Sequence, residues 1–157
     1  MYFKNSKQTL SLSNYLTKIS NRNSRTLLSK LRLGVLPLEI EKGRHHNLSR
    51  NERICQFCQT NSVEDELHFL FDCPAFETSR SISINLISNV HPSFHQFPTE
   101  HKLNYLFFNE NLSKYILEIS SNMLSKLFED RKKLLAAHER KWSCEIVRPL
   151  VIRLRKS

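Results

Sequence analysis

The 157-residue chain contains little glycine, little aspartate and no long apolar run. Two glycines are too few for the turns of a long β-meander, so helices are favoured. The three aspartates include no pair close enough in sequence to suggest a two-metal carboxylate site. No stretch approaches the roughly eighteen apolar residues of a membrane span, and the first residues lack a signal-peptide core. We therefore expect an intracellular protein, nuclear or cytoplasmic, with no membrane partner.

Three of the four cysteines fall within nineteen residues, together with a histidine. Cys55, Cys58, His68 and Cys73 have the spacing C-x2-C-x9-H-x4-C. Cysteine thiolates and a neutral imidazole are ligands that Zn²⁺ prefers, and four of them close a tetrahedral structural site. A closed site has no position for water or substrate, so the motif predicts a zinc-stapled binding module rather than an enzyme.

Other interpretations of these residues stay open at this point. They can be ordinary buried cysteines beside a surface histidine, or Cys55 and Cys58 can form a disulfide, although disulfides are rare in reducing compartments. His45 and His46 are substitute ligands, but two adjacent histidines in a basic loop are more often solvated. A zinc deaminase would need H-x-E followed by P-C-x-x-C, whereas the cysteine pair here precedes the histidine.

The net charge of +9 is distributed unevenly along the chain. Residues 1–53 carry eleven Lys or Arg and three acids, residues 54–130 carry four and ten, and residues 131–157 carry nine and two. The two ends are therefore basic and the middle is acidic. Basic surfaces attract phosphate backbones through counterion release, so both ends are candidate nucleic-acid surfaces; the alternative is solvated helix faces.

The apolar periodicity predicts a mainly α fold with helices over 11–19, 24–33, 63–72, 75–90, 99–108 and 112–138. Ser24 is the expected N-cap of the second helix and Gly34 its stop, and 37–41 adds a single turn before the loop 44–53. Phe76, Ile82, Leu86 and Val90 are expected in the core. The stripe over 112–128 indicates a core helix or, alternatively, a homodimer seam. Pro149 interrupts a basic, β-branched end that suggests a strand or an extended tail.

The basic residues near the motif are candidate phosphate contacts. The 24–33 helix is amphipathic, with leucines toward a core and cationic side chains outward, and three further arginines precede the first cysteine. An aromatic residue in the cysteine turn can stack on an unpaired base or pack beneath the zinc module. The expected nucleic-acid-binding residues are Arg25, Lys30, Arg32, Arg44, Arg50, Arg53 and Phe57.

Four runs around the motif follow a family pattern: Leu31-Arg32-Leu33-Gly34, Leu38-Glu39-Ile40-Glu41-Lys42-Gly43-Arg44, Arg50-Asn51-Glu52-Arg53-Ile54-Cys55-Gln56-Phe57-Cys58, and Val63-Glu64-Asp65-Glu66-Leu67-His68-Phe69-Leu70-Phe71-Asp72-Cys73-Pro74. With them, the stretch from Leu28 to Arg80 resembles the C-terminal region of reverse transcriptases from non-LTR (LINE-type) retrotransposons. The resemblance implies a basic helical region, a C-C-H-C zinc-binding domain and nucleic-acid binding during target-primed reverse transcription. The polymerase's Tyr-x-Asp-Asp-type sequence is missing, and 157 residues cannot hold a polymerase or an endonuclease.

We therefore expect four parts: a basic helical arm over 1–53, a zinc-knuckle-like CCHC module over 54–76 inserted among helices, a helical scaffold over 77–139 and a basic tail over 140–157. The predicted function is nucleic-acid binding, to RNA or DNA, by a detached C-terminal piece of such a protein. The alternatives are a zinc-stabilised protein–protein interaction scaffold and a non-functional element remnant. The sequence does not choose between RNA and DNA.

Overall fold

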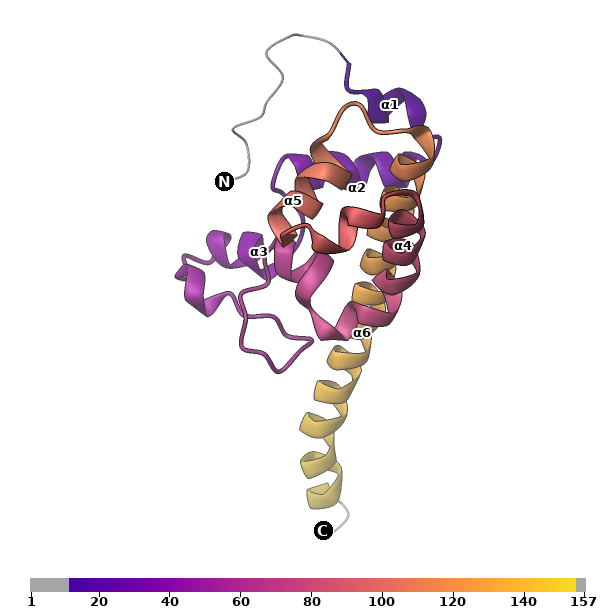
Figure 1. Ribbon diagram of the computed structural model, residues 1–157. Coiled ribbons are helices and arrows are strands. Elements are labelled where there is room, and N and C mark those ends of the chain that lie inside the picture. The colour runs from indigo at the N-terminus through magenta and orange to yellow at the C-terminus, as the bar shows by residue number, and fades with distance from the viewer. Residues whose placement is uncertain (1–11, 155–157) are drawn as a thin grey trace. The chain divides into compact units, whose positions relative to one another are not determined.

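The computed structural model describes the backbone of residues 12–154 and the side chains of residues 12–138. This part of the chain is mainly helical (Figure 1) and contains no strand, only an isolated antiparallel bridge between Ile54 and Val63. The elements labelled η are single turns of 3₁₀ or π type. In order, the elements are α1 Asn14–Lys18, α2 Arg22–Arg32, α3 Glu39–His45, η2 Arg50–Glu52, η3 His68–Asp72, η4 Pro74–Phe76, α4 Glu77–Val90, η5 Pro92–Gln96, α5 Thr99–Leu103, η6 Asn104–Phe108 and α6 Lys114–Leu154.

The chain divides into two compact units, one ending at Leu127 and one beginning at Phe128. Helix α6 belongs to both, because its first turns lie in the first unit and the rest forms the second. Among the described residues, no helix combines the length and the apolarity that crossing a bilayer requires. The mainly α fold expected from the sequence is confirmed.

Helix α2 begins and ends with local signals, one of which the sequence interpretation misplaced. Asn21 is the N-cap, since its side chain accepts a hydrogen bond from the Ser24 amide at 3.1 Å, so the prediction that Ser24 caps this helix is wrong. The C-terminus is a Schellman motif, in which the amide of Gly34 donates to Leu31 and that of Val35 to Lys30. Gly34 has φ 64°, a left-handed conformation that favours glycine, and the predicted stop is confirmed.

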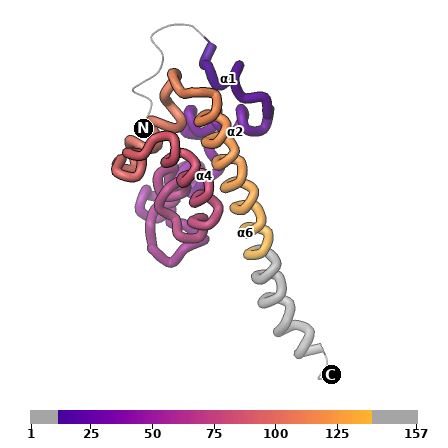
Figure 2. The backbone as a smooth tube through the Cα atoms, turned by 45° about the vertical axis from the view of Figure 1, so that its right-hand side comes forward, coloured from indigo at the N-terminus to yellow at the C-terminus, as the bar shows by residue number. Residues whose placement is uncertain are grey.

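Helix α2 contacts the first turns of α6 (Figure 2), and both contribute buried side chains to the core of the first unit. Hydroxyls of Ser24 and Ser125 meet at 2.9 Å across this contact. The interpretation of the stripe over 112–128 as a core face is confirmed for most of its residues up to 127, because the following side chains are buried: Leu112, Ile116, Ile119, Met123, Leu124 and Leu127. Tyr115, which has the same spacing, is 52% exposed, so its place in the core face is wrong.

Helix α4 turns a different face to the core than the sequence predicted. Ile82, Leu86 and Val90 are 69%, 39% and 54% exposed, so their assignment to the core is wrong, whereas Ile87 is fully buried and Phe76 is buried as expected. The reason is that both sides of this helix carry isoleucine or leucine, and sequence spacing alone does not say which side meets a neighbour.

Two further expectations about local structure are also wrong. Helix α3 passes through Gly43 instead of stopping before it, because the absence of a side chain there makes room for Arg53; a Cβ at Gly43 would lie 2.5 Å from Arg53 Cγ. The strand or extended tail expected beyond residue 140 is a continuation of α6 to Leu154, with Pro149 inside it. This run contains no glycine that would end the helix. The side chains of the expected 140–157 tail lie outside the described residues.

Glu64 ties the cysteine-containing segment to α3. Its side chain is fully buried, and its carboxylate accepts a hydrogen bond from the Glu39 amide at 2.8 Å, at the first turn of α3. A second hydrogen bond joins the same two segments through the backbone, from the Ile40 amide to the Glu64 carbonyl at 3.1 Å. A carboxylate at a helix N-terminus satisfies an amide that has no partner within the helix.

Replacing Glu64 tests this link. We expect Glu64→Ala to lower the free energy of unfolding by about 1–3 kcal/mol, because the Glu39 amide loses its acceptor in a buried position. Glu64→Gln keeps a side-chain oxygen and should cost less. Urea unfolding of both variants measures the difference, and equal losses for alanine and glutamine would contradict the capping role.

Candidate metal centre

The first two predicted metal ligands lie on a narrow hairpin. The Cys55 amide donates to the Ser62 carbonyl and the Glu64 amide to the Arg53 carbonyl, both at 2.9 Å. The chain reverses near Asn61, whose φ of 56° is left-handed, a conformation that asparagine tolerates. Cys58 therefore lies close to the hairpin tip, with its Sγ 3.0 Å from Thr60 Oγ1.

The other two ligands lie at the ends of a single turn, η3. Asp65 precedes it and accepts a hydrogen bond from the His68 amide at 3.0 Å. The helix expected from residue 63 therefore begins later than predicted, because Val63 pairs with Ile54 in the hairpin. The π-type hydrogen bond from the Cys73 amide to the His68 carbonyl then closes the turn at 2.6 Å. Cys73 comes directly after this turn and before Pro74, as predicted, so both ligands face the hairpin.

The four side chains converge on one point. Their ligand atoms all lie within 4.8 Å of one another, with Cys55 Sγ 3.8 Å from Cys73 Sγ and Cys58 Sγ 3.4 Å from His68 Nε2. Three of the four side chains are buried, and Cys58 is half-buried. The cysteines carry free thiols, so the Cys55–Cys58 disulfide alternative does not apply. This Cys₃His group is positioned to hold a metal ion.

The protonation of the group in the absence of metal is asymmetric. The hydrogen bond between Cys55 and Cys73, together with burial, raises the pKa of the Cys55 thiol. The same hydrogen bond lowers the pKa of Cys73. Burial lowers the pKa of His68 below its usual value of 6.5, so its imidazole is neutral at neutral pH, the form that binds a metal.

A buried arginine and a cluster of aromatic rings pack beside the Cys₃His group and support it. Arg80, only 4% exposed, donates to the Cys73 carbonyl at 2.7 Å and pairs with Glu77. Phe76 meets the rings of Phe57 and Phe69 edge-on, with centroids 5.6 and 5.1 Å away. The sequence interpretation missed Arg80; its only signal is a position two helical turns beyond the last ligand.

Several of the predicted nucleic-acid contacts already have partners within the protein. The Arg53 guanidinium donates to the carbonyls of Leu48 and Ile40, at 2.7 and 2.9 Å, and so holds the loop before the hairpin. Arg32 donates to the Phe107 carbonyl and pairs with Glu110 at 2.6 Å. The role of these two arginines in the fold is therefore clear, whatever else they contact.

The remaining predicted contacts are divided between two places. Arg44 and Arg50 are exposed and pair with Glu41 and Asp65, beside the hairpin. On α2, the Arg25 guanidinium donates to the Ile19 carbonyl at 2.8 Å, and Lys30 is exposed.

Phe57 packs against Phe76 beneath the hairpin, as the packing alternative expected. The possible substitute ligands His45 and His46 are exposed and lie outside the Cys₃His group.

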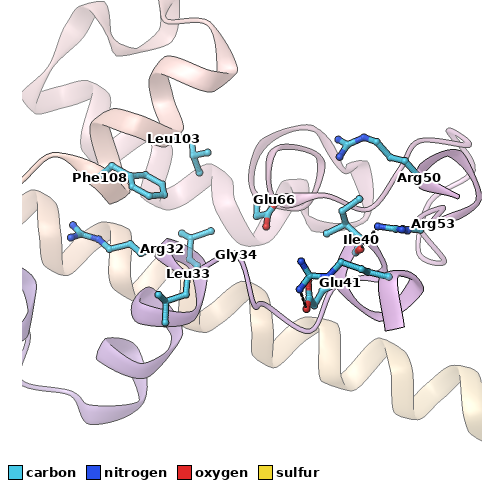
Figure 3. Close-up of a pocket in the computed structure, with 12 residues that line it drawn as sticks. Arg32, Leu33, Gly34, Ile40, Glu41, Arg50, Arg53, Glu66, Leu103 and Phe108 are labelled. Carbon is cyan, nitrogen blue, oxygen red and sulfur yellow. Dashed lines mark hydrogen bonds and ion pairs between the residues drawn. The ribbon is translucent and has the colours of Figure 1, made fainter. Parts of the chain in front are cut away.

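Four of these arginines share one cavity. Arg32, Arg44, Arg50 and Arg53 all line a cavity of about 340 Å³, together with Glu41, Glu66 and several apolar side chains (Figure 3). The sequence interpretation named Glu66 only as part of the run that carries the family resemblance and did not foresee the cavity. No family model, no curated protein and no solved structure matches the chain, so the site is interpreted from its own geometry.

Proposed function

We propose that the Cys₃His group binds one Zn²⁺ as a structural ion. In a tetrahedral site with ordinary zinc bond lengths, two sulfurs lie about 3.8 Å apart and a sulfur and a nitrogen about 3.6 Å apart. The distances of 3.8 Å between Cys55 and Cys73 and 3.4 Å between Cys58 and His68 fit those edges. Four protein ligands leave no open position on the metal, which argues for a binding module rather than an enzyme.

We further propose that this zinc-stabilised protein binds nucleic acid, as the resemblance to retrotransposon reverse transcriptases implies. The observation that carries the proposal is the pair of exposed arginines beside the hairpin. Arg44 and Arg50 have side chains that are 60% and 63% exposed. Each guanidinium is at the surface although its partner carboxylate is not, and the N–H donors that the ion pairs with Glu41 and Asp65 leave unused can bind a phosphate.

The salt dependence of binding tests this proposal. We expect the zinc-loaded protein to shift single-stranded RNA or DNA in a gel at low salt, with affinity falling steeply as salt rises. The double variant Arg44→Ala, Arg50→Ala should reduce the salt slope by about 1.4, or about 0.7 for each lost phosphate contact on a single strand. Absence of any shift by the folded, zinc-loaded protein would overturn the proposal.

Two controls locate the surface. Arg22→Ala removes one arginine charge, half of what the double variant removes, from the exposed first turn of α2 and should leave the slope close to that of the unchanged protein. If the double variant keeps the full slope, but Lys132→Ala with Lys133→Ala lowers it, the binding surface lies in the basic C-terminal part.

Zinc binding should weaken as pH falls. The thiols must lose their protons to bind, so the affinity is expected to change by about two to three powers of ten per pH unit between about pH 6.5 and 8. Burial lowers the pKa of His68, so its imidazole loses its proton more readily and contributes less to this slope than the thiols do. Competition with a chelator at several pH values measures it, and a pH-independent affinity would contradict thiolate ligation.

A protein-interaction scaffold is the second candidate, favoured by the exposed face of α4. Ile82, Leu86 and Val90 follow one another at four-residue steps and form an apolar stripe on this helix. If this stripe binds a second copy of the chain, sedimentation will show a dimer that Ile82→Asp converts to monomer. If the protein stays monomeric at high concentration, dimerisation through this stripe is wrong.

A further inference from the structure

The cavity beside the metal centre has two chemically different ends. Figure 3 shows Leu33, Leu103 and Phe108 on one side, with Arg32 beside them, and Arg50, Arg53, Glu41 and Ile40 on the other. The Arg32 guanidinium is held there by the Phe107 carbonyl and Glu110. Its volume of about 340 Å³ is at the small end of the range for ligand pockets. The cavity therefore suits a small ligand with a flat apolar part and an anionic part.

The apolar end is built on the core. Leu103 is 1% exposed, so it forms a firm wall, and Phe108 adds an aromatic ring at the end of η6. Gly34, in the Schellman turn that ends α2, also lines the cavity and presents backbone without a side chain. A planar ring can lie against such a surface, since aromatic faces gain from stacking and from apolar contact.

The charged end carries more N–H donors than its ion pairs use. Arg44 donates to Glu41 through one terminal nitrogen, and Arg50 donates to Asp65 in the same way at 2.7 Å. A guanidinium has five N–H donors in a planar fork, which matches the oxygens of a phosphate. Two exposed forks at the rim of one cavity therefore form a place for a phosphate group.

Glu66 lies between the two ends in Figure 3 and is half-buried. The contacts of the described residues include no side chain that donates a hydrogen bond to its carboxylate. A carboxylate in this place favours a ligand that brings its own N–H donors. Guanine offers two adjacent donors, cytosine and adenine offer an amino group, and uracil offers a single N–H between two repelling carbonyls.

We infer that this cavity binds one nucleotide of an unpaired strand, with the base against the wall formed by Phe108 and Leu103, the base's N–H donors on Glu66, and the phosphate on Arg44 and Arg50. The inference deepens the proposed function and rests on it, because it names the part of a nucleic acid that the arginines hold. It also assigns a base preference, with GMP bound most tightly and UMP least.

The two glycines of the chain provide the measurement. In full-length, zinc-loaded protein labelled with ¹⁵N-glycine, the amide spectrum contains two glycine signals, and labelling the leucine carbonyl identifies Gly34, which follows Leu33. Gly34 lines the cavity, so its signal should move on titration with GMP, with a dissociation constant on the order of 0.1–1 mM. UMP and the uncharged guanosine should each bind roughly tenfold more weakly. Equal affinities for GMP, UMP and inorganic phosphate would overturn the inference.

Three variants separate the two halves of the cavity. Glu66→Gln should remove most of the tenfold difference between GMP and UMP, and Arg44→Ala with Arg50→Ala should remove most of that between GMP and guanosine. Arg22→Ala, outside the cavity, should change neither ratio. Unchanged ratios in the first two variants, with zinc content and helical signal intact, would also overturn the inference.

Failure of the inference and failure of the proposed function give different results. If the protein shifts single strands but Gly34 does not respond to any nucleotide, the cavity is not a nucleotide site and strand binding stands. If GMP shifts the Gly34 signal with the expected preference but no strand is shifted in the gel, nucleotide binding in the cavity is confirmed and the proposal that the protein binds single strands is wrong.

Discussion

Replacing Cys58 with serine is expected to lower zinc affinity by roughly a hundred- to a thousandfold, because structural zinc sites release about 10–16 kcal/mol shared among four ligands. Cys58 is the half-buried member of the group, so the substitution removes a ligand while disturbing little packing. Residues 53–76 should then open locally, since the bridge at Ile54 and Val63 is the hairpin's one pairing in the described chain. The helices should keep their circular dichroism.

Native mass spectrometry and hydrogen exchange measure the two effects. The unchanged protein should carry one zinc, and chelation should raise exchange over 53–76 to the level of the Cys58→Ser variant. Cys144→Ser, which removes the one cysteine outside the motif, is the matched control and should keep the metal. Full zinc occupancy in Cys58→Ser at limiting zinc would show that the assigned ligands are wrong.

Replacing Phe76 with alanine is expected to lower the free energy of unfolding by about 3–5 kcal/mol. Its ring is 1% exposed and fills the space between Phe57 and Phe69, so alanine leaves a cavity at the centre of this cluster. The Phe76 amide also donates to the Cys73 carbonyl at 3.2 Å, so loosening this turn should weaken zinc binding as well.

Guanidinium unfolding in the presence of zinc gives the size of the effect. Ile82→Ala is the control, because Ile82 is 69% exposed and its truncation should change stability by no more than about 0.5 kcal/mol. A larger loss for Ile82→Ala than for Phe76→Ala would contradict the packing described here.

The metal centre was largely predictable from the sequence because its parts are local. All four ligands lie within nineteen residues, and short-range signals set their positions: Asp65 accepts a hydrogen bond at the start of the η3 turn, and Pro74 follows the last ligand. The pairing of Cys55 with Cys73 and of Cys58 with His68 was not predictable, because it depends on how the hairpin and the turn face each other.

The partners of the arginines could not be predicted from the sequence. In the sequence, Arg50 and Arg53 are equivalent candidates for phosphate contact, three residues apart. In the fold, Arg53 lies over Gly43 and donates to one backbone carbonyl in α3 and one in the loop that follows it, whereas Arg50 stays at the surface. A side chain's partners depend on which backbone carbonyls lack a hydrogen bond nearby, and that is a property of the folded loop.

The amino-acid sequence by itself determined the helical class, the members of the Cys₃His group and the stop at Gly34, because periodicity, residue spacing and backbone preference act within a few residues. Only the tertiary structure decided which face of α4 is buried, that Glu64 caps α3, and that four arginines and Glu66 meet at one cavity. The last two features are contacts between separate segments of the chain: α2, α3, the hairpin and η6. Burial and hydrogen bonding between such segments follow from their packing together, and no short stretch of sequence contains that information.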